Sequence, residues 1–158
     1  MLMIKKYSIK FSKYYYNIYI DNNRVIKGYF TASPQGIVVN SLGENTIVDM
    51  LIRYFHGEAI NFSNVQIDFP YGSIFEKNVW LTLRKIPYGE VRSYKWVAEN
   101  IGKPKAYRAV GNAISKNPIL VIIPCHRVIK SNGHIGGFTS IGGVELKRML
   151  LRLEGVKL

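Results

Sequence analysis

Residues 119–129 read ILVIIPCHRVI, and they contain Cys125, the single cysteine of the 158-residue chain. Five apolar residues precede Pro124, which has no backbone N–H to donate and ends a strand. We therefore expect a buried strand over residues 119–123 that opens into a loop at Cys125. His126 and Arg127 follow directly, and positive charge beside a cysteine favours the thiolate over the thiol. The stretch predicts a nucleophilic cysteine.

A single cysteine in this position has two alternatives to a nucleophilic role. A free cysteine is more often a small buried hydrophobe, so simple packing is the first. A metal or redox site is excluded by counting, because one cysteine and three histidines cannot form a Cys-x-x-Cys pair or an intramolecular disulfide. No metal and no cofactor are predicted. Neighbouring side chains on an extended chain point apart, so His126 would need a water relay or a bent backbone to act on the sulfur.

The positive charge is concentrated in the half of the chain that carries the cysteine. Residues 1–70 contain seven Lys/Arg and five Asp/Glu, whereas residues 71–158 contain fifteen and five, which gives most of the net charge of +12. This asymmetry favours a polyanionic partner such as nucleic acid over a merely solvated basic face. With 47% hydrophobic and 20% charged residues and no long apolar run, the chain reads as a globular cytoplasmic protein, nuclear only if its source is eukaryotic.

The first half reads as a small sheet with one helix. Segments 4–11, 14–20 and 24–30 are rich in Tyr, Ile, Val and Phe and partly alternate, which predicts strands. Residues 46–55 have apolar side chains at helical spacing, and Gly57 is a plausible stop. The tyrosines are expected to pack within the strands, and no catalytic cluster is expected in this half.

After the turn-forming segment Phe-Pro-Tyr-Gly at residues 69–72, the spacing of apolar residues becomes helical. We therefore expect a domain boundary there, between residues 1–70 and 71–158. Ser73 and Glu76 form a capping-box pattern at the start of an amphipathic helix. Two short helices over 93–101 and 106–114 follow, separated by Gly-Lys-Pro-Lys. This is helix-turn-helix spacing, which is also common in proteins that bind no DNA. The second helix combines small side chains with one long cation, Arg108, which suits a narrow groove.

Five motifs in order carry a resemblance over residues 73–158. They are Val91-Arg92-Ser93-Tyr94, Arg108-Ala109-Val110-Gly111, Asn117-Pro118, Ile123-Pro124-Cys125-His126-Arg127-Val128 and Leu153-Glu154-Gly155. This order resembles the O6-alkylguanine-DNA alkyltransferase family. The resemblance implies an α+β fold, with a small N-terminal sheet-plus-helix domain of ribonuclease H-like type. A mainly helical C-terminal domain would follow, with a helix-turn-helix and an active-site cysteine loop.

The resemblance also implies roles for single residues. Cys125 would accept the alkyl group irreversibly, once per molecule, from O6-alkylguanine or O4-alkylthymine in double-stranded DNA. His126 would be its water-mediated base, oriented by Glu154, which by itself reads as a solvated carboxylate at a helix end. Tyr94 would donate a hydrogen bond or proton to the departing base, and Asn117 would hold the turn before the cysteine. The protein would act as a monomer.

Contacts to DNA and to the substrate are carried over in the same way. Arg108 would replace a nucleotide that is flipped out of the duplex, while the helix-turn-helix binds the minor groove. Phe138 and Thr139 would line the substrate pocket with Tyr94, although Phe138 stands where the family often has tyrosine and the loop over 136–143 is about two residues longer. The full set of expected DNA contacts is Arg92, Ser93, Lys95, Lys105, Arg108, Ala109, Gly111 and Arg127.

Two other classes of function remain as alternatives. A non-catalytic DNA-binding module, including the alkyltransferase-like proteins that lack the nucleophile, would not need a cysteine at position 125. A cysteine hydrolase would have its histidine far away in the sequence, whereas here the histidine is the next residue. Both alternatives fit the sequence less well than alkyl transfer.

Overall fold

The computed structural model describes residues 3–158 and begins with a four-stranded sheet. Its strands are β1 (Ile4–Phe11), β2 (Tyr14–Asp21), β3 (Arg24–Thr31) and β4 (Ile37–Val38), in the order β3-β2-β1-β4. β1, β2 and β3 pair antiparallel, and β4 adds to β1 in parallel. Asn22 and Asn23 both have positive φ in the β2–β3 turn, which is the backbone of a two-residue hairpin with the twist that adjacent strands require. The three predicted strands are confirmed.

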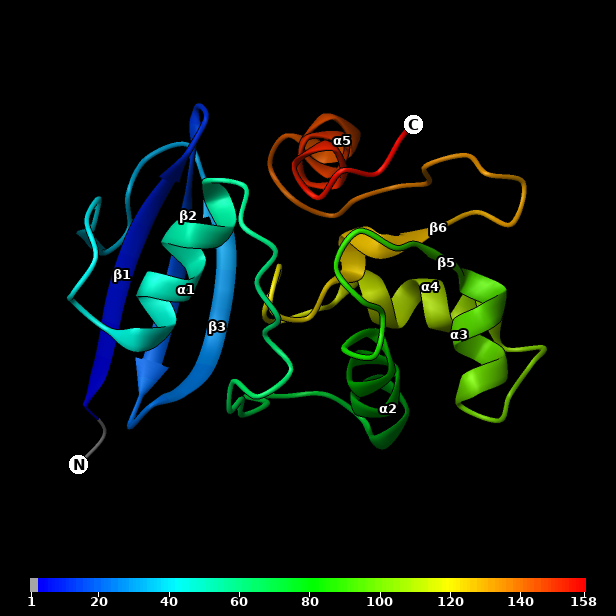
Figure 1. Ribbon diagram of the computed structural model, residues 1–158. Helices are drawn as coiled ribbons and strands as arrows, with labels where there is room; N and C mark the ends of the chain where they lie inside the picture. Colours follow the sequence, from blue (N-terminus) through cyan, green and yellow to red (C-terminus); the bar gives the residue numbers. More distant parts are fainter. Residues whose placement is uncertain (1–2) are drawn as a thin grey trace.

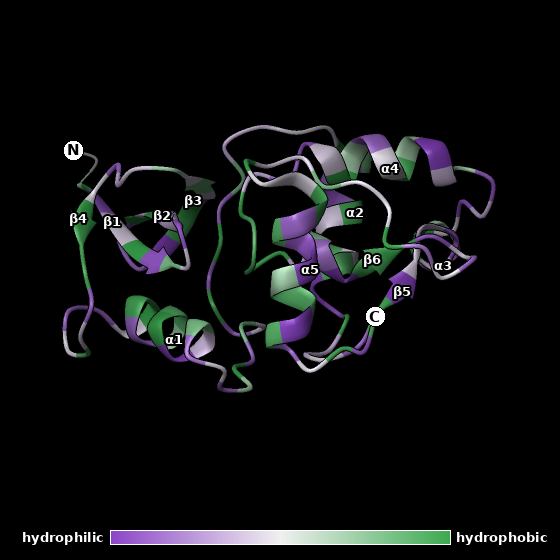
Figure 2. Ribbon diagram, turned by 90° about the horizontal axis from the view of Figure 1, so that it is seen from above, coloured by the Kyte–Doolittle hydropathy of each residue, from purple (hydrophilic) through white to green (hydrophobic). Residues whose placement is uncertain are grey.

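Helix α1 (Thr46–Phe55) covers one face of this sheet (Figure 2). It begins at Asn45, whose side chain accepts hydrogen bonds from the backbone N–H groups of Ile47 and Val48 and so satisfies two of the free donors at the helix start. Its apolar face packs on the inward side chains of the strands, with the Phe11 and Phe55 rings 4.9 Å apart. The helix ends before Gly57, which has a φ of +96°.

The second half of the chain is mainly helical, as expected, and lies beside the sheet (Figure 1). Ser73 and Glu76 form the predicted capping box at the start of the first of its helices. The Trp80 indole N–H donates to the Ala113 carbonyl at 2.8 Å and so joins two of the helices. The elements of this half are α2 (Ile74–Leu83), β5 (Arg92–Ser93), α3 (Tyr94–Asn100), α4 (Tyr107–Ser115), the 3-10 turn η1 (Cys125–Arg127), β6 (Val128–Ile129) and α5 (Gly143–Leu153).

The prediction of a strand over residues 119–123 is wrong, because this buried segment forms a compact turn. The Ile123 N–H donates to the Ile119 carbonyl at 2.9 Å, and Val121 adopts a left-handed φ of +73°. The turn docks on the edge of the sheet, where the Leu120 N–H donates to the Gly28 carbonyl at 2.9 Å. A side chain at Gly28 would collide with the hydroxyl of Tyr16 from the neighbouring strand, so the position of the Tyr16 ring requires glycine here.

The buried side chains form one continuous cluster that draws on both halves of the chain. Tyr16, Ile18 and Leu51 from the first half are fully buried, as are Trp80, Ile123 and Leu146 from the second. The first half is therefore packed directly against the segment that leads to Cys125.

Candidate active site

Cys125 lies at the first position of η1, in the wall of a cavity of about 300 Å³. The thiol-bearing residue is only 5% exposed, so a reacting group must enter the cavity to reach it. The structure brings four of the predicted site residues to the same cavity wall: Tyr94, Asn117, Phe138 and Thr139. Gly111 of α4, expected at the DNA, lines it too. A 3-10 turn over Cys125–Arg127 replaces the extended backbone assumed from the sequence.

Asn117 fixes the turn that precedes the cysteine. Its side-chain N–H donates to the Ile123 carbonyl at 2.8 Å, and its side-chain oxygen accepts from the Ile119 N–H at 2.9 Å. Burial raises the pKa of the Cys125 thiol, and hydrogen bonding from Asn117 together with the charge of Lys147 offsets part of that rise. The resting group is thus a thiol that needs a base before it can act as a nucleophile.

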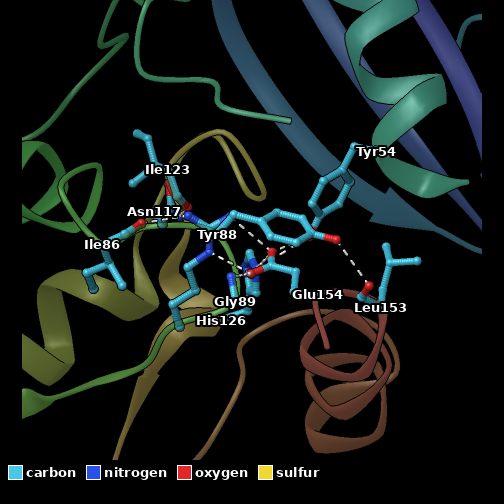
Figure 3. Close-up of polar contacts among 10 residues, drawn as sticks. Tyr54, Ile86, Tyr88, Gly89, Asn117, Ile123, His126, Leu153 and Glu154 are labelled. Carbon is cyan, nitrogen blue, oxygen red and sulfur yellow. Dashed lines mark hydrogen bonds and ion pairs between the residues drawn. The ribbon is translucent and has the colours of Figure 1, made fainter. Parts of the chain in front are cut away.

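His126, the residue after the cysteine, forms a fully buried pair with Glu154 (Figure 3). The imidazole Nε2 lies 2.6 Å from Glu154 Oε2. Arg127 donates to the same carboxylate through Nε at 2.8 Å and Nη2 at 3.1 Å, and the Gly89 N–H donates at 3.2 Å. The carboxylate that reads as solvated in the sequence is instead surrounded by donors at the end of α5.

The groups around Glu154 set the protonation states of Glu154 and His126. Burial alone would raise the pKa of the Glu154 carboxyl, but the hydrogen bonds from His126 and Arg127 and the charge of Arg127 hold it well below its usual range. Burial lowers the pKa of His126 against the opposing pull of Glu154, so the ring is neutral at neutral pH. Since the carboxylate is ionised, Nε2 must carry the proton that joins it to Glu154. Nδ1 accepts no hydrogen bond from residues 3–158 and remains as the basic nitrogen.

Lys147 of α5 is a site residue that the sequence did not reveal. It is 1% exposed, and its Nζ donates to the carbonyls of Val128, Ile135 and Gly137 at 2.7, 2.6 and 3.1 Å. These bonds tie the strand after the cysteine to the loop that carries Phe138. A lysine on an amphipathic helix normally reads as solvated, so no signal in the sequence distinguished it.

Arg127 corrects the expectation of a DNA contact from this residue. Its side chain is 7% exposed, and it is held by Glu154 and by the Ile86 carbonyl, which accepts from Nη1 at 2.7 Å. If the Arg127 side chain moved out to contact DNA, the Glu154 carboxylate would remain buried without this partner, which costs stability. Arg127 is therefore part of the His126 and Glu154 cluster.

The first half also reaches the site, which corrects the expectation that it holds no part of a catalytic cluster. Tyr54 of α1 donates its hydroxyl hydrogen to Glu154 Oε2 at 2.6 Å, from 100 positions away in the chain. Tyr16 of β2 donates to the carbonyl of Leu120, a cavity-lining residue, at 2.5 Å. Both tyrosines occupy positions that the sequence pattern predicts to be buried. The pattern therefore predicts packing for them and gives no sign of these hydrogen bonds.

Apart from Gly111 and Arg127, the predicted DNA-contacting residues lie on or beside helices α3 and α4, and none of them lines the Cys125 cavity. Arg108, Ala109, Lys95 and Lys105 are exposed. Arg92 is half-buried over the Trp96 ring and pairs with Glu90 at 2.9 Å. The hydroxyl of Ser93 caps α3 by accepting from the Trp96 N–H at 3.0 Å, so its position in the chain is fixed by the helix start.

Within residues 3–158, no group of three or more His, Cys, Asp or Glu side chains is placed to hold a metal ion. Nor does this part of the chain contain a helix of the length and apolarity needed to cross a membrane.

Comparison with known proteins matches this site to one family. Residues 74–156 match the family model described as 6-O-methylguanine DNA methyltransferase, DNA binding domain. The methylated-DNA--protein-cysteine methyltransferase of Methanosarcina acetivorans is 52% identical over 105 residues, which cover 66% of this chain and 65% of that protein. The protein of the same name from Mycolicibacterium paratuberculosis is 42% identical over 85% of this chain and 79% of its own length.

The likeness extends to the whole fold in solved structures. The O6-methylguanine methyltransferase of Mycobacterium tuberculosis matches with a TM-score of 0.78 at 35% identity, covering 96% of this chain and 93% of that one. A structure of the Mycobacterium tuberculosis protein in complex with DNA matches with the same TM-score at 34% identity, over 95% and 92% of the two chains. The predicted resemblance is confirmed.

Proposed function

Because the chain belongs to the 6-O-methylguanine DNA methyltransferase family, we propose that it repairs DNA by moving an alkyl group from O6-alkylguanine to Cys125. The observation that carries this proposal is the shared cavity of Cys125 and Tyr94, together with the pairing of the next residue, His126, with the buried Glu154. The protein is a single-turnover methyltransferase, since no ordinary base expels an alkyl group from the thioether that forms.

The site residues supply the proton movements of this transfer. His126 Nδ1 takes the proton of the Cys125 thiol through a bridging water, and the resulting imidazolium is stabilised by Glu154. The thiolate then attacks the alkyl carbon, so that an S–C bond forms as the bond from carbon to guanine O6 breaks. Burial raises the pKa of Tyr94, which keeps its hydroxyl protonated and able to donate to the departing guanine. The same chemistry extends to O4-alkylthymine.

Binding to DNA is assigned to the helix-turn-helix of α3 and α4. The alkylated base must leave the duplex, because Cys125 is reached only through its cavity. The exposed Arg108 fills the position of the flipped base from the minor groove, and Lys95 and Lys105 contact phosphates. The Mycobacterium tuberculosis protein whose structure contains DNA supports this partner.

The proposal also covers the DNA partner, the oligomeric state, the cellular location and the domains. The partner is double-stranded DNA with an O6-alkylguanine, and the protein acts as a monomer without a cofactor. Its relatives named above come from bacteria and archaea, which supports a cytoplasmic location. Residues 1–70 and 71–158 are taken as the two domains, with Phe138 and Thr139 as walls of the substrate cavity.

Intact-mass analysis tests the function directly. After incubation with duplex DNA that contains one O6-methylguanine, the protein should gain a single methyl group, located on Cys125 by peptide mapping. Cys125→Ala should gain nothing, and an unmodified duplex should leave the parent mass unchanged. Release of several methyl groups per protein molecule would rule out the single-turnover mechanism.

A further inference from the structure

Tyr54 links the first half of the chain to the proton relay of the second. Its hydroxyl oxygen lies 2.6 Å from Glu154 Oε2 and 3.5 Å from His126 Nε2, and the residue is fully buried (Figure 3). Burial and the adjacent Glu154 raise the pKa of Tyr54 well above its ordinary value, so the hydroxyl stays protonated and donates. Glu154 Oε2 therefore accepts from Tyr54 and His126 at the same time.

The ring of Tyr54 is fixed by aromatic neighbours rather than by its hydroxyl. It packs edge to face against Phe62 at 5.5 Å and against Tyr88 at 6.2 Å between ring centres. These contacts bury the ring whether or not the hydroxyl is present. The hydroxyl adds one interaction, and that interaction ends on the carboxylate that orients the proposed base.

We propose that Tyr54 is a positioning residue for alkyl transfer, whose hydroxyl holds Glu154 in place and limits how strongly this carboxylate binds the His126 ring. The proposal rests on the function proposed above and extends it, because it makes the N-terminal half part of the reaction machinery. A carboxylate that accepts more hydrogen bonds has its negative charge more dispersed, so it stabilises a neighbouring imidazolium less. Tyr54 thereby helps to keep His126 neutral and available as a base.

Other charged and titratable groups face the same pair and set the background. Arg127 from η1 donates to both oxygens of Glu154, and the Lys147 ammonium from α5 opposes protonation of His126. Tyr88, from the turn after α2, lies against Tyr54 and donates its hydroxyl to the Leu153 carbonyl at 3.2 Å. None of these groups is altered when the Tyr54 hydroxyl is removed, so the effect of that hydroxyl can be isolated.

The test is Tyr54→Phe in the full-length chain, with two readouts. In the pH dependence of single-turnover methyl transfer from an O6-methylguanine duplex, the acid limb should move to higher pH by about half a unit or more, because His126 gains a proton more readily. Titration of the His126 ring resonances by NMR should show the same upward shift without any DNA present. An equal loss of rate at every pH, with an unmoved His126 titration, would overturn the proposal.

Tyr16→Phe is the matched control, since it removes another buried hydroxyl of the first half that donates across to the second. It should lower stability without moving the His126 titration; a shift equal to that of Tyr54→Phe would show a general packing effect and overturn the proposal. A fluorinated tyrosine installed at position 54 is a stronger donor of almost the same shape. It should move the acid limb and the NMR titration to lower pH, and an upward shift would contradict the proposal. If the parent protein gains no methyl group, the function proposed above fails, while the NMR titrations still decide the role of Tyr54.

Discussion

At the scale of single residues, the site is organised around Glu154 rather than around the cysteine. This carboxylate accepts hydrogen bonds from His126, Arg127, Tyr54 and the Gly89 backbone, and its side chain is fully buried. A buried charge is stable only when it is paired and hydrogen-bonded. The cost of losing one partner is therefore high, and the orientation of the imidazole is closely tied to the stability of the fold.

The charge of Glu154 predicts a component of acid unfolding. In the unfolded chain this carboxyl protonates near its ordinary pKa of 4.5, whereas in the native state it stays ionised to lower pH. Between these two values the unfolded state binds more protons, so acidification favours unfolding. Glu154→Gln should cost about 3 kcal/mol or more at pH 7, because Arg127 is left buried and unpaired.

Urea unfolding of the parent and of Glu154→Gln across pH 7 to pH 3 measures this contribution. The difference in unfolding free energy should be constant above pH 5 and should shrink as the pH falls below 4.5, where the unfolded parent takes up its proton. A difference that stays the same down to pH 3 would show that the carboxylate carries no pH-dependent stabilisation.

At the scale of elements, the helix pair α3 and α4 separates binding from chemistry. α4 contributes Gly111 to the wall of the cavity, while Arg108, about one turn earlier on the same short helix, is exposed and does not line the cavity. Small side chains such as Ala109 let this helix approach a narrow groove closely. Arg108 is then the one cationic side chain of α4 and is long enough to fill a gap in the base stack.

Arg108→Ala should therefore slow repair of a duplex by about 10- to 100-fold, because only the duplex imposes a flipping cost of a few kcal/mol. Reaction with free O6-methylguanine base should change by about twofold or less, since the free base needs no flipping. Single-turnover rates on the two substrates provide the comparison, with Arg53→Ala on the exposed end of α1 as the control. Equal losses on both substrates would place Arg108 in the chemistry or in folding.

The sequence predicts those elements that local interactions determine, and it fails for those that long-range contacts determine. The three strands and the helix at 46–55 follow local period and capping, and they were predicted within one or two residues. The segment at 119–123 was misassigned, because its apolar run is bent by docking onto Gly28, which no local pattern reveals. The resemblance supplied Cys125 and its partners, whereas Tyr54 and Lys147 were missed because long-range contacts alone distinguish them from ordinary packing and surface residues.

At the scale of the whole molecule, the charge asymmetry predicts how the protein searches DNA. The second half carries most of the positive charge, and the exposed cations of its helix-turn-helix, such as Lys95, Lys105 and Arg108, are free to meet phosphates. Neutralising phosphates releases counterions, so binding to unmodified duplex should weaken steeply with salt, with a slope of about −3 to −4 on a log–log plot for four contacts. Fluorescence titrations over a range of salt concentrations measure this slope.

The same titrations with unrelated duplexes test for indifference to sequence. Alanine and glycine on α4 offer few hydrogen bonds to base edges, so affinities at one salt concentration should differ little. A preference of more than about 4 kcal/mol for one sequence would contradict minor-groove binding without sequence readout and would favour a transcription regulator instead.

The single cysteine has a consequence for counting molecules. If Cys125 is alkylated once and permanently, every chain that has acted is a chain without a thiol, and the sequence contains no second thiol to obscure the difference. The thiols titrated in an unfolded sample then equal the number of molecules still able to act. The capacity of a cell for this reaction is consequently a stock of protein, replenished only by synthesis, and the loss of thiol records how many lesions have been met.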